Sequence, residues 1–134
     1  MLKEITQYLV TNTASLTKTL VEGTNLFAGH YESDKQANIT VVEAIVPGIA
    51  NYDLGDFWQK PIRIFVRNSS FFTGQDLAQS LFELLHGKDQ ITLPVVSTGP
   101  TYLCNINGTT PAYIGQDEKG RYQFSINFMF VTQQ

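Results

Sequence analysis

The sequence is poor in the features that several classes of protein require. Its 134 residues include one cysteine, Cys104, so no internal disulfide can form and a reducing cytoplasm is the expected place of synthesis. No apolar run approaches the ~20 residues that cross a bilayer, and the first ten residues lack the continuous apolar core of a signal peptide. We therefore expect a soluble protein without a membrane partner.

Charge is also scarce. Charged residues make up 16% of the chain, and nine Lys and Arg against twelve Asp and Glu leave a net charge of −3. A protein that grips phosphate backbones carries an excess of positive charge, so tight binding of DNA is not expected. The apolar fraction of 43% excludes a disordered chain, and the length favours a single domain over residues 1–134.

The residue types that catalyse reactions or bind metals are few and isolated. His30 and His86 have no cysteine or histidine at zinc-ligand spacing. Asp53 and Asp56 could form a carboxylate pair, but the other ligands of a calcium loop are missing, so solvated loop acids are the favoured interpretation. Cys104 alternates with apolar residues and is favoured as a buried thiol rather than a nucleophile. The sequence predicts no enzyme, no cofactor and no metal site.

Apolar spacing predicts two amphipathic helices. Over residues 2–21, apolar side chains recur near helical spacing with polar side chains on the other side, and Gly23 is expected to end the helix. A second helix is predicted over residues 73–85, where the apolar stripe is broad. His86-Gly87 ends it, because glycine suits the left-handed position after a helix.

Alternating and β-branched residues predict the strands. These span residues 38–44, 62–68, 91–96, 102–106, 112–115 and 121–131. Residues 45–61 contain prolines and glycines without any period, which predicts a long irregular loop and a working surface. The order of elements predicts an α+β domain, with two helices packed on one face of a mostly antiparallel, mixed β-sheet.

The stretch GQDEKGRYQFSINFMF has the pattern of a hairpin. Asp117 and Gly120 are the residues that the first and fourth positions of a type I turn with a left-handed bulge require. In the strand that follows, aromatic and aliphatic side chains point to one face, while Gln123, Ser125 and Asn127 point to the other. One face is predicted to be core and the other to meet water.

Arg63 and Arg67 share a strand face with Phe65, an arrangement that could stack single-stranded nucleic acid. Two arginines are few in an acidic chain, so a packed face bordered by ion pairs is the favoured interpretation. A small nucleic-acid-binding or ligand-binding module that uses these three residues is the alternative function.

Exposure-prone positions are the candidates for protein contacts. They belong to the 45–61 loop, the turn and the polar strand face. The set is Tyr52, Phe57, Trp58, Arg63, Arg67, Asp117, Glu118, Arg121, Gln123, Ser125 and Asn127. Arg121 can pair with Asp117 or Glu118, within the turn or across subunits, and a solvent-exposed turn is equally supported.

Four motifs follow one another along nearly the whole chain. They are Asn25-Leu26-Phe27-x-Gly29, P-x-R-x-x-V-R over residues 61–67, Leu85-His86-Gly87, and Gly115-x-Asp117-Glu118-x-Gly120-Arg121-Tyr122-x-Phe124-Ser125-x-Asn127 after Pro111. In this order and spacing they resemble a family of small minor capsid proteins, the tail terminator or head-to-tail joining proteins of long-tailed bacteriophages and prophages. Between Ala44 and Phe57 the chain departs from that pattern, because relatives are richer in glycine and proline there.

The resemblance implies an α+β subunit of a homo-oligomeric ring, expected to be a hexamer, in the virion at the head-tail junction. Such a ring caps the tail tube protein and meets the head-completion, or neck, protein, and it is made in the cytoplasm of the bacterial host. The family is not enzymatic and needs no cofactor. DNA is expected to pass through the ring without specific binding, and the net charge of −3 agrees with this expectation. Such a ring closes through heterologous contacts, in which one patch of a subunit meets a different patch of its neighbour. Loops and a hairpin edge are expected to contribute to these contacts.

Overall fold

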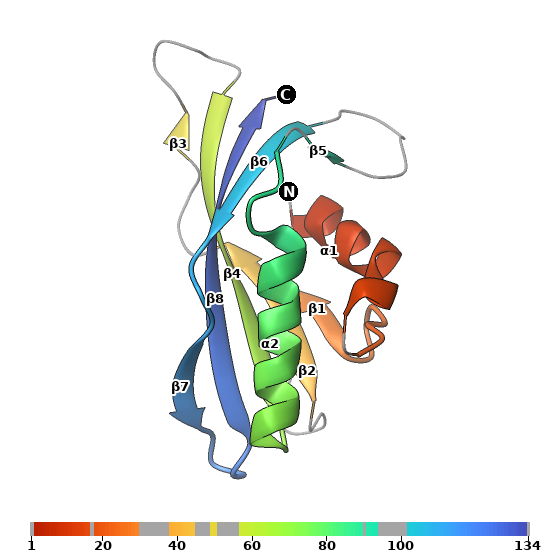
Figure 1. Cartoon of the computed structure of the whole chain (residues 1–134), viewed down its shortest axis with the longest axis vertical. Coiled ribbons are helices and arrows are strands. Elements are labelled where there is room, and N and C mark those ends of the chain that lie inside the picture. The colour runs from red at the N-terminus through yellow and green to blue at the C-terminus, as the bar shows by residue number, and fades with distance from the viewer. Residues whose placement is uncertain are drawn as a thin grey trace.

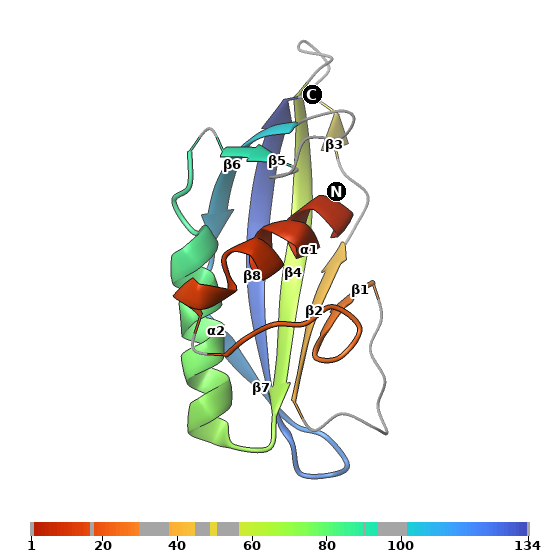
Figure 2. The same cartoon turned by 90° about the vertical axis from the view of Figure 1, so that its right-hand side faces the viewer.

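Two helices cover one face of a β-sheet in the computed structural model of the chain. The structure describes residues 2–16, 18–29, 38–44, 49–50, 57–89, 91–93 and 102–133. Figures 1 and 2 show α1 (Leu2–Thr11) and α2 (Phe71–Leu85) on the same side of the strands. A short 3-10 helix, η1 (Thr13–Ser15), follows α1. The predicted α+β class is confirmed.

The sheet is mixed and mostly antiparallel, as predicted. The strands are β1 (Leu26–Ala28), β2 (Ile39–Ala44), β3 (Ile49–Ala50), β4 (Phe57–Asn68), β5 (Ile91–Leu93), β6 (Tyr102–Gly108), β7 (Ala112–Gln116) and β8 (Tyr122–Gln133). Their order is β1-β2-β4-β8-β6-β5, with β3 paired to β4 and β7 paired to β8. The β1–β2 pair is parallel, whereas β4 and β8 pair antiparallel along the 12 residues of each strand.

The main core lies between the helices and the sheet. Ile64 of β4 stands opposite Ile126 of β8, and both side chains are fully buried. Ile5 and Leu9 of α1 and Leu81 of α2 complete this cluster from the helical side. Full burial of one such aliphatic side chain contributes roughly 1.5–3 kcal/mol, so the inward faces of β4 and β8 contribute substantially to the stability of the domain. The predicted inward direction of the alternate residues of β8 is confirmed.

The prediction of one helix over residues 2–21 is wrong, because α1 ends at Thr11. The side-chain amide of Asn12 donates to the Tyr8 carbonyl oxygen at 2.9 Å, and the hydroxyl of Thr13 accepts from the Leu20 amide at 2.8 Å. Such side-chain bonds to the backbone compete with helix continuation. Leu20 is nevertheless buried in the core. It reaches the core because the chain folds back after α1, and its position in the sequence happens to match the apolar spacing of a longer helix.

Gly23 does not end a helix but lies in a turn. Its φ is +82°, and its amide donates to the carbonyl oxygen of Leu26 at 2.9 Å. This turn leads into β1, which pairs parallel with β2 by placing Leu26 opposite Thr40. With three residues, β1 is too short to give the sequence a visible period.

The prediction of an irregular loop over residues 45–61 is also wrong where the structure describes it. Residues 49–50 form β3, and β4 begins at residue 57. Proline removes a backbone donor and is normally excluded from central strands. Pro61 is accommodated because it falls where one edge of β4 changes its partner strand. Ile62 pairs with β2 and Gln59 pairs with β3, so Pro61 pairs with neither of these strands. Residues 45–48 and 51–56 lie outside the described residues.

The other predicted elements differ from the structure mainly at their ends. α2 begins at Phe71, two residues before its predicted start, and Gly87 at φ +78° follows it as predicted. β6 and β8 extend beyond their predicted bounds to Gly108 and Gln133. β5 is described over residues 91–93, and residues 94–96 of its predicted span lie outside the described residues.

Candidate interaction surfaces

The hairpin between β7 and β8 has the predicted turn. Gly120 has a φ of +74°, and its amide donates to the Asp117 carbonyl oxygen at 3.0 Å. The Asp117 amide in turn donates to the Arg121 carbonyl oxygen at 2.9 Å. Glycine tolerates the left-handed conformation at this position without strain, which is why the turn can close here.

The Asp117 carboxylate organises this turn. Its Oδ1 accepts from the amides of Lys119 and Arg121, both at 2.9 Å, and its Oδ2 accepts from the Arg121 guanidinium Nε at 2.6 Å. Desolvation raises the pKa of Asp117, but these hydrogen bonds and the Arg121 charge outweigh it, so the pKa lies below its ordinary value. Arg121 therefore pairs within the turn, as one of the predicted alternatives proposed, while Glu118 is exposed.

Arg67 connects this turn to the sheet. Its Nη1 lies 3.9 Å from Asp117 Oδ2, and its side chain is only 1% exposed. Arg67 stands opposite Gln123 in the β4–β8 register, on the sheet face away from the helices. Two guanidinium groups thus converge on one carboxylate in a buried setting, where removing a partner costs more than it does at the surface. The turn is held against the sheet rather than projecting freely.

The residues of the predicted nucleic-acid face are packed and paired. Phe65 is 7% exposed and belongs to a second small cluster with Ile39 and Val41. The Arg63 Nε donates to Glu43 Oε1 at 2.6 Å, and its Nη2 contacts the same oxygen. The interpretation of a packed face bordered by ion pairs is confirmed. A stacking surface built on the Phe65 ring is not available, because that ring is buried.

The remaining predicted contact residues differ in how much surface they offer. Asn127 is exposed and Gln123 is half-buried. Ser125 is buried opposite Ala112 of β7, so the prediction that this strand face meets water is wrong at Ser125. Trp58 is exposed at the far end of β4, with the Lys60 Nζ 5.8 Å from the centre of its ring. Tyr52 and the side chain of Phe57 lie outside the described part of the chain. Whether these residues contact partners stays a prediction.

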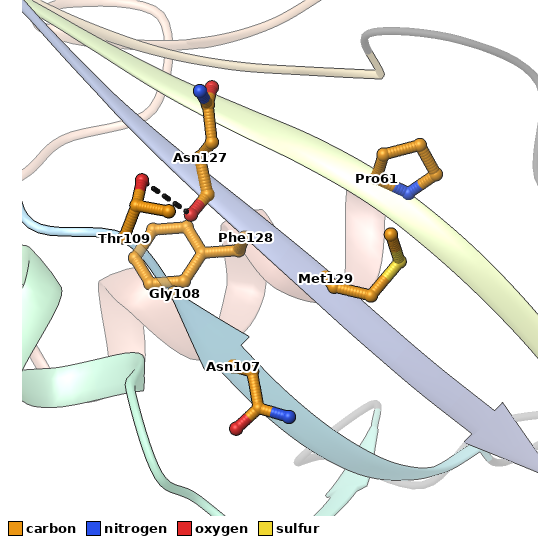
Figure 3. Close-up of a pocket in the computed structure, with 7 residues that line it drawn as sticks. All are labelled: Pro61, Asn107, Gly108, Thr109, Asn127, Phe128 and Met129. Carbon is orange, nitrogen blue, oxygen red and sulfur yellow. Dashed lines mark hydrogen bonds between the residues drawn. The ribbon is translucent and has the colours of Figure 1, made fainter.

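A pocket of about 370 Å³ opens on the sheet face away from the helices. Pro61 of β4 and Asn107 of β6 both stand opposite Met129 of β8, so three neighbouring strands contribute to it (Figure 3). The lining residues are Pro61, Asn107, Gly108, Thr109, Asn127, Phe128 and Met129. None of them carries a charge, so we name this site the uncharged pocket.

Gly108 shapes one wall of the uncharged pocket. A Cβ atom on it would lie 2.5 Å from Cε1 of Phe128, so only glycine lets the end of β6 approach this ring. The next residue, Thr109, donates its amide to the Asn127 carbonyl oxygen at 2.9 Å. The Gly108 amide donates to Nδ1 of His86, also at 2.9 Å. The wall is therefore fixed to both β8 and the end of α2.

A group of exposed apolar side chains lies where α2 begins beside β7. Phe72 is 72% exposed, and Tyr113 and Ile114 are each 49% exposed. The Phe71 ring makes edge contacts to Phe72 at 5.5 Å and to Tyr113 at 5.4 Å between ring centres. We name Phe72 and Tyr113, which the Phe71 ring bridges, the apolar knob. The pairing of β7 with β8 shifts register between Tyr113 and Gly115, which marks a bulge in this strand.

Neither the knob nor the uncharged pocket was predicted from the sequence. For the knob a signal existed, because Phe71 and Phe72 are adjacent, and adjacent residues of a helix point about 100° apart. Both rings cannot face the same core, so one of them must be exposed. The uncharged pocket had no comparable signal, since its lining comes from three strands that are distant in the sequence.

The described residues hold no group of three or more His, Cys, Asp and Glu side chains that could bind a metal ion, and no helix among them is long and apolar enough to span a membrane. Cys104 is buried, and desolvation raises the pKa of its thiol to about 11 despite the nearby Lys60 charge. His86 lies at the end of α2 as predicted, whereas His30, Asp53 and Asp56 lie outside the described residues.

The described residues thus combine packed ion pairs, an uncharged pocket and an exposed apolar knob on one α+β domain. A family model described as bacteriophage tail terminator protein matches residues 7–134. The chain therefore belongs to the bacteriophage tail terminator family, as its motifs indicated, and has a structural role in a phage tail as a component of the virion. A search of curated proteins gave no match.

Proposed function

We propose that this chain is a ring-forming tail terminator that caps the tail tube and joins the tail to the head. The observation that carries the proposal is the family match, which extends over residues 7–134. The ring is a homo-oligomer, with a hexamer as the expected size. It contacts the tail tube protein on one side and the neck, or head-completion, protein on the other, as a minor component of the capsid-tail connection without catalytic activity.

The charges on the open sheet face support passage of DNA without specific binding. Arg63 is held by Glu43, and Arg121 is held by Asp117. Each pair neutralises a cation that could otherwise bind a phosphate, and the whole chain carries a net charge of −3. Since retained phosphate contacts would resist movement of the genome and make it depend on salt, this arrangement suits a channel.

Filter binding of DNA across a salt series tests the alternative function as a nucleic-acid module. Because the Phe65 ring is buried and Arg63 is paired, we expect weak binding with a shallow dependence of log affinity on log salt. A steep decrease of log affinity with log salt would favour the binding module over the structural role, provided that it becomes shallower in Arg63→Ala. The control Lys3→Ala, far from this face, should leave the slope unchanged.

Electron microscopy of phage particles that lack this protein tests the main proposal. We expect tails of uncontrolled length, tails that are not joined to heads, or both, and complementation with the intact gene should restore normal particles. Native mass spectrometry of the protein released from tails should give the mass of a closed ring. Particles with normal tails and normal joining in its absence would refute the proposed function.

A further inference from the structure

The chain carries an exposed apolar projection and a separate uncharged cavity. We propose that in the ring the apolar knob of one copy, with Phe72 at its centre, fills the uncharged pocket of the next copy. This inference rests on the proposed ring and identifies which surfaces of the subunit meet. It assigns a role to two features that the family match does not explain.

The knob is exposed and rests on the Phe71 ring. Phe72 exposes 72% of its surface, although its ring is braced by an edge contact to Phe71 at 5.5 Å. Phe71 in turn contacts Phe124 of β8 at 5.4 Å, which anchors the group to the sheet. An aromatic side chain offers a large apolar surface and has only two rotatable bonds, so it loses little conformational entropy on binding, which is a property of residues that dominate interfaces.

The pocket has the chemistry to receive such a group. Its lining includes the apolar side chains of Met129 and Pro61 and the neutral residues Asn107 and Asn127. A volume of about 370 Å³ corresponds to about a dozen water molecules, so an aromatic side chain and part of a neighbour fit. The absence of charge from both the lining residues and the knob disfavours phosphate or acidic peptides as occupants and matches the two surfaces to each other.

The position of the two surfaces indicates a second copy as the occupant. Phe124 supports the knob and Met129 lines the pocket, and the five residue steps from one to the other span about 17 Å along β8. The pocket also opens on the sheet face away from α2, so the knob cannot fill the pocket of its own chain. Complementary patches at different places on one subunit associate head to tail, which is the geometry that closes a ring.

Cysteine cross-linking in assembled tails tests this contact. Tails are assembled with the double variant Gln75→Cys and Asn127→Cys, which keeps the Phe72 ring and places a thiol one helical turn from it, and are treated with a short thiol-reactive cross-linker. We expect a ladder of covalent oligomers that ends at a closed ring, whereas each single variant gives no species beyond a dimer. The wild-type protein serves as a control, because Cys104 is buried and should not react. The variant Glu83→Cys with Asn127→Cys, which places the thiol on an exposed position about 16 Å along α2 from Phe72, should give no ladder.

A second pair of variants separates loss of contact from loss of folding. Phe72→Ser removes an exposed side chain, so its melting temperature should equal that of wild type and of Gln75→Ser, while incorporation into tails falls at least tenfold for Phe72→Ser alone. If the double-cysteine variant enters tails of normal length without forming a ladder, the knob-in-pocket contact is wrong and the proposed function stands. If the protein is absent from wild-type tails, the proposed function fails and the inference fails with it.

Discussion

The imidazole Nδ1 of His86 accepts a 2.9 Å hydrogen bond from the backbone amide of Gly108. His86 caps the end of α2, and Gly108 is the last residue of β6, so this bond joins the helix to the sheet beside the uncharged pocket. The His86 ring also stacks on Phe82, with 4.8 Å between ring centres. The next amide, that of Gly87, donates to the Ile106 carbonyl oxygen at 2.9 Å. Two consecutive residues thus fix this end of α2.

Replacing His86 by alanine should lower the free energy of unfolding by about 1 kcal/mol, since one hydrogen bond and one ring contact are lost. Urea denaturation measures this as a lower midpoint with an unchanged slope. Amide hydrogen exchange should become faster at Gly108 than in Gln75→Ala, which alters an exposed position of the same helix. Unchanged exchange at Gly108 would contradict a role for the imidazole in holding the pocket wall.

Replacing Gly108 by alanine should destabilise the domain by about 1–3 kcal/mol through overpacking. The new methyl group would lie 2.5 Å from Cε1 of Phe128, which is buried and cannot move outward freely. The double variant Gly108→Ala with Phe128→Leu should lose less than the sum of the two single losses, because the smaller side chain relieves the clash. Strict additivity in thermal or urea unfolding would show that the close approach does not limit stability.

The elements that could be predicted from the sequence are those whose pattern and packing agree. Phe124 and Ile126 alternate with polar residues because β8 has one face on the core, and this period survives in the structure. Asp117 and Gly120 predicted the hairpin because a tight turn depends on a few local residues. The pairing of Arg121 within the turn was one of several open alternatives, and the local carboxylate decided among them.

The elements that could not be predicted depend on partners distant in the sequence. Leu20 has helical spacing relative to α1 yet reaches the core after a chain reversal that the Thr13 hydroxyl stabilises. Pro61 argued against a strand, but β4 accommodates it at a step between its two short neighbours, β2 and β3. The knob and the uncharged pocket arise only when β4, β6, β7 and β8 are side by side. Local patterns carry no information on that assembly.

The thiol of Cys104 should be protected from labelling in the folded protein. Burial raises its pKa to about 11, so the reactive thiolate is scarce at pH 8 and the sulfur is also out of contact with solvent. We expect an aromatic disulfide reagent to label the native protein at least a hundredfold more slowly than the urea-unfolded chain. Rapid labelling without denaturant would contradict the packing of β6 and would require Cys104→Ser as the background for the cross-linking experiment.

Asp117→Asn should lower the free energy of unfolding at pH 7 by about 1–3 kcal/mol, because hydrogen bonds that involve charged groups are stronger than neutral ones. The carboxylate accepts from the Arg121 guanidinium at 2.6 Å and lies 3.9 Å from the buried Arg67 guanidinium. Glu118→Gln, at an exposed position of the same turn, is the matched control and should change stability little.

The loss caused by Asp117→Asn should also depend on pH. The pKa of Asp117 in the folded protein lies below the ordinary value of about 4 that it takes in the unfolded chain, so the unfolded state binds more protons in this range. The stability that the carboxylate contributes is therefore complete above about pH 4 and is lost as the pH falls through the folded pKa. Thermal unfolding of both proteins from pH 7 to pH 3 should show their curves converging at the acid end. A gap that stays constant down to pH 3 would mean that shape, and not the charge shared with Arg121 and Arg67, explains the effect of Asp117.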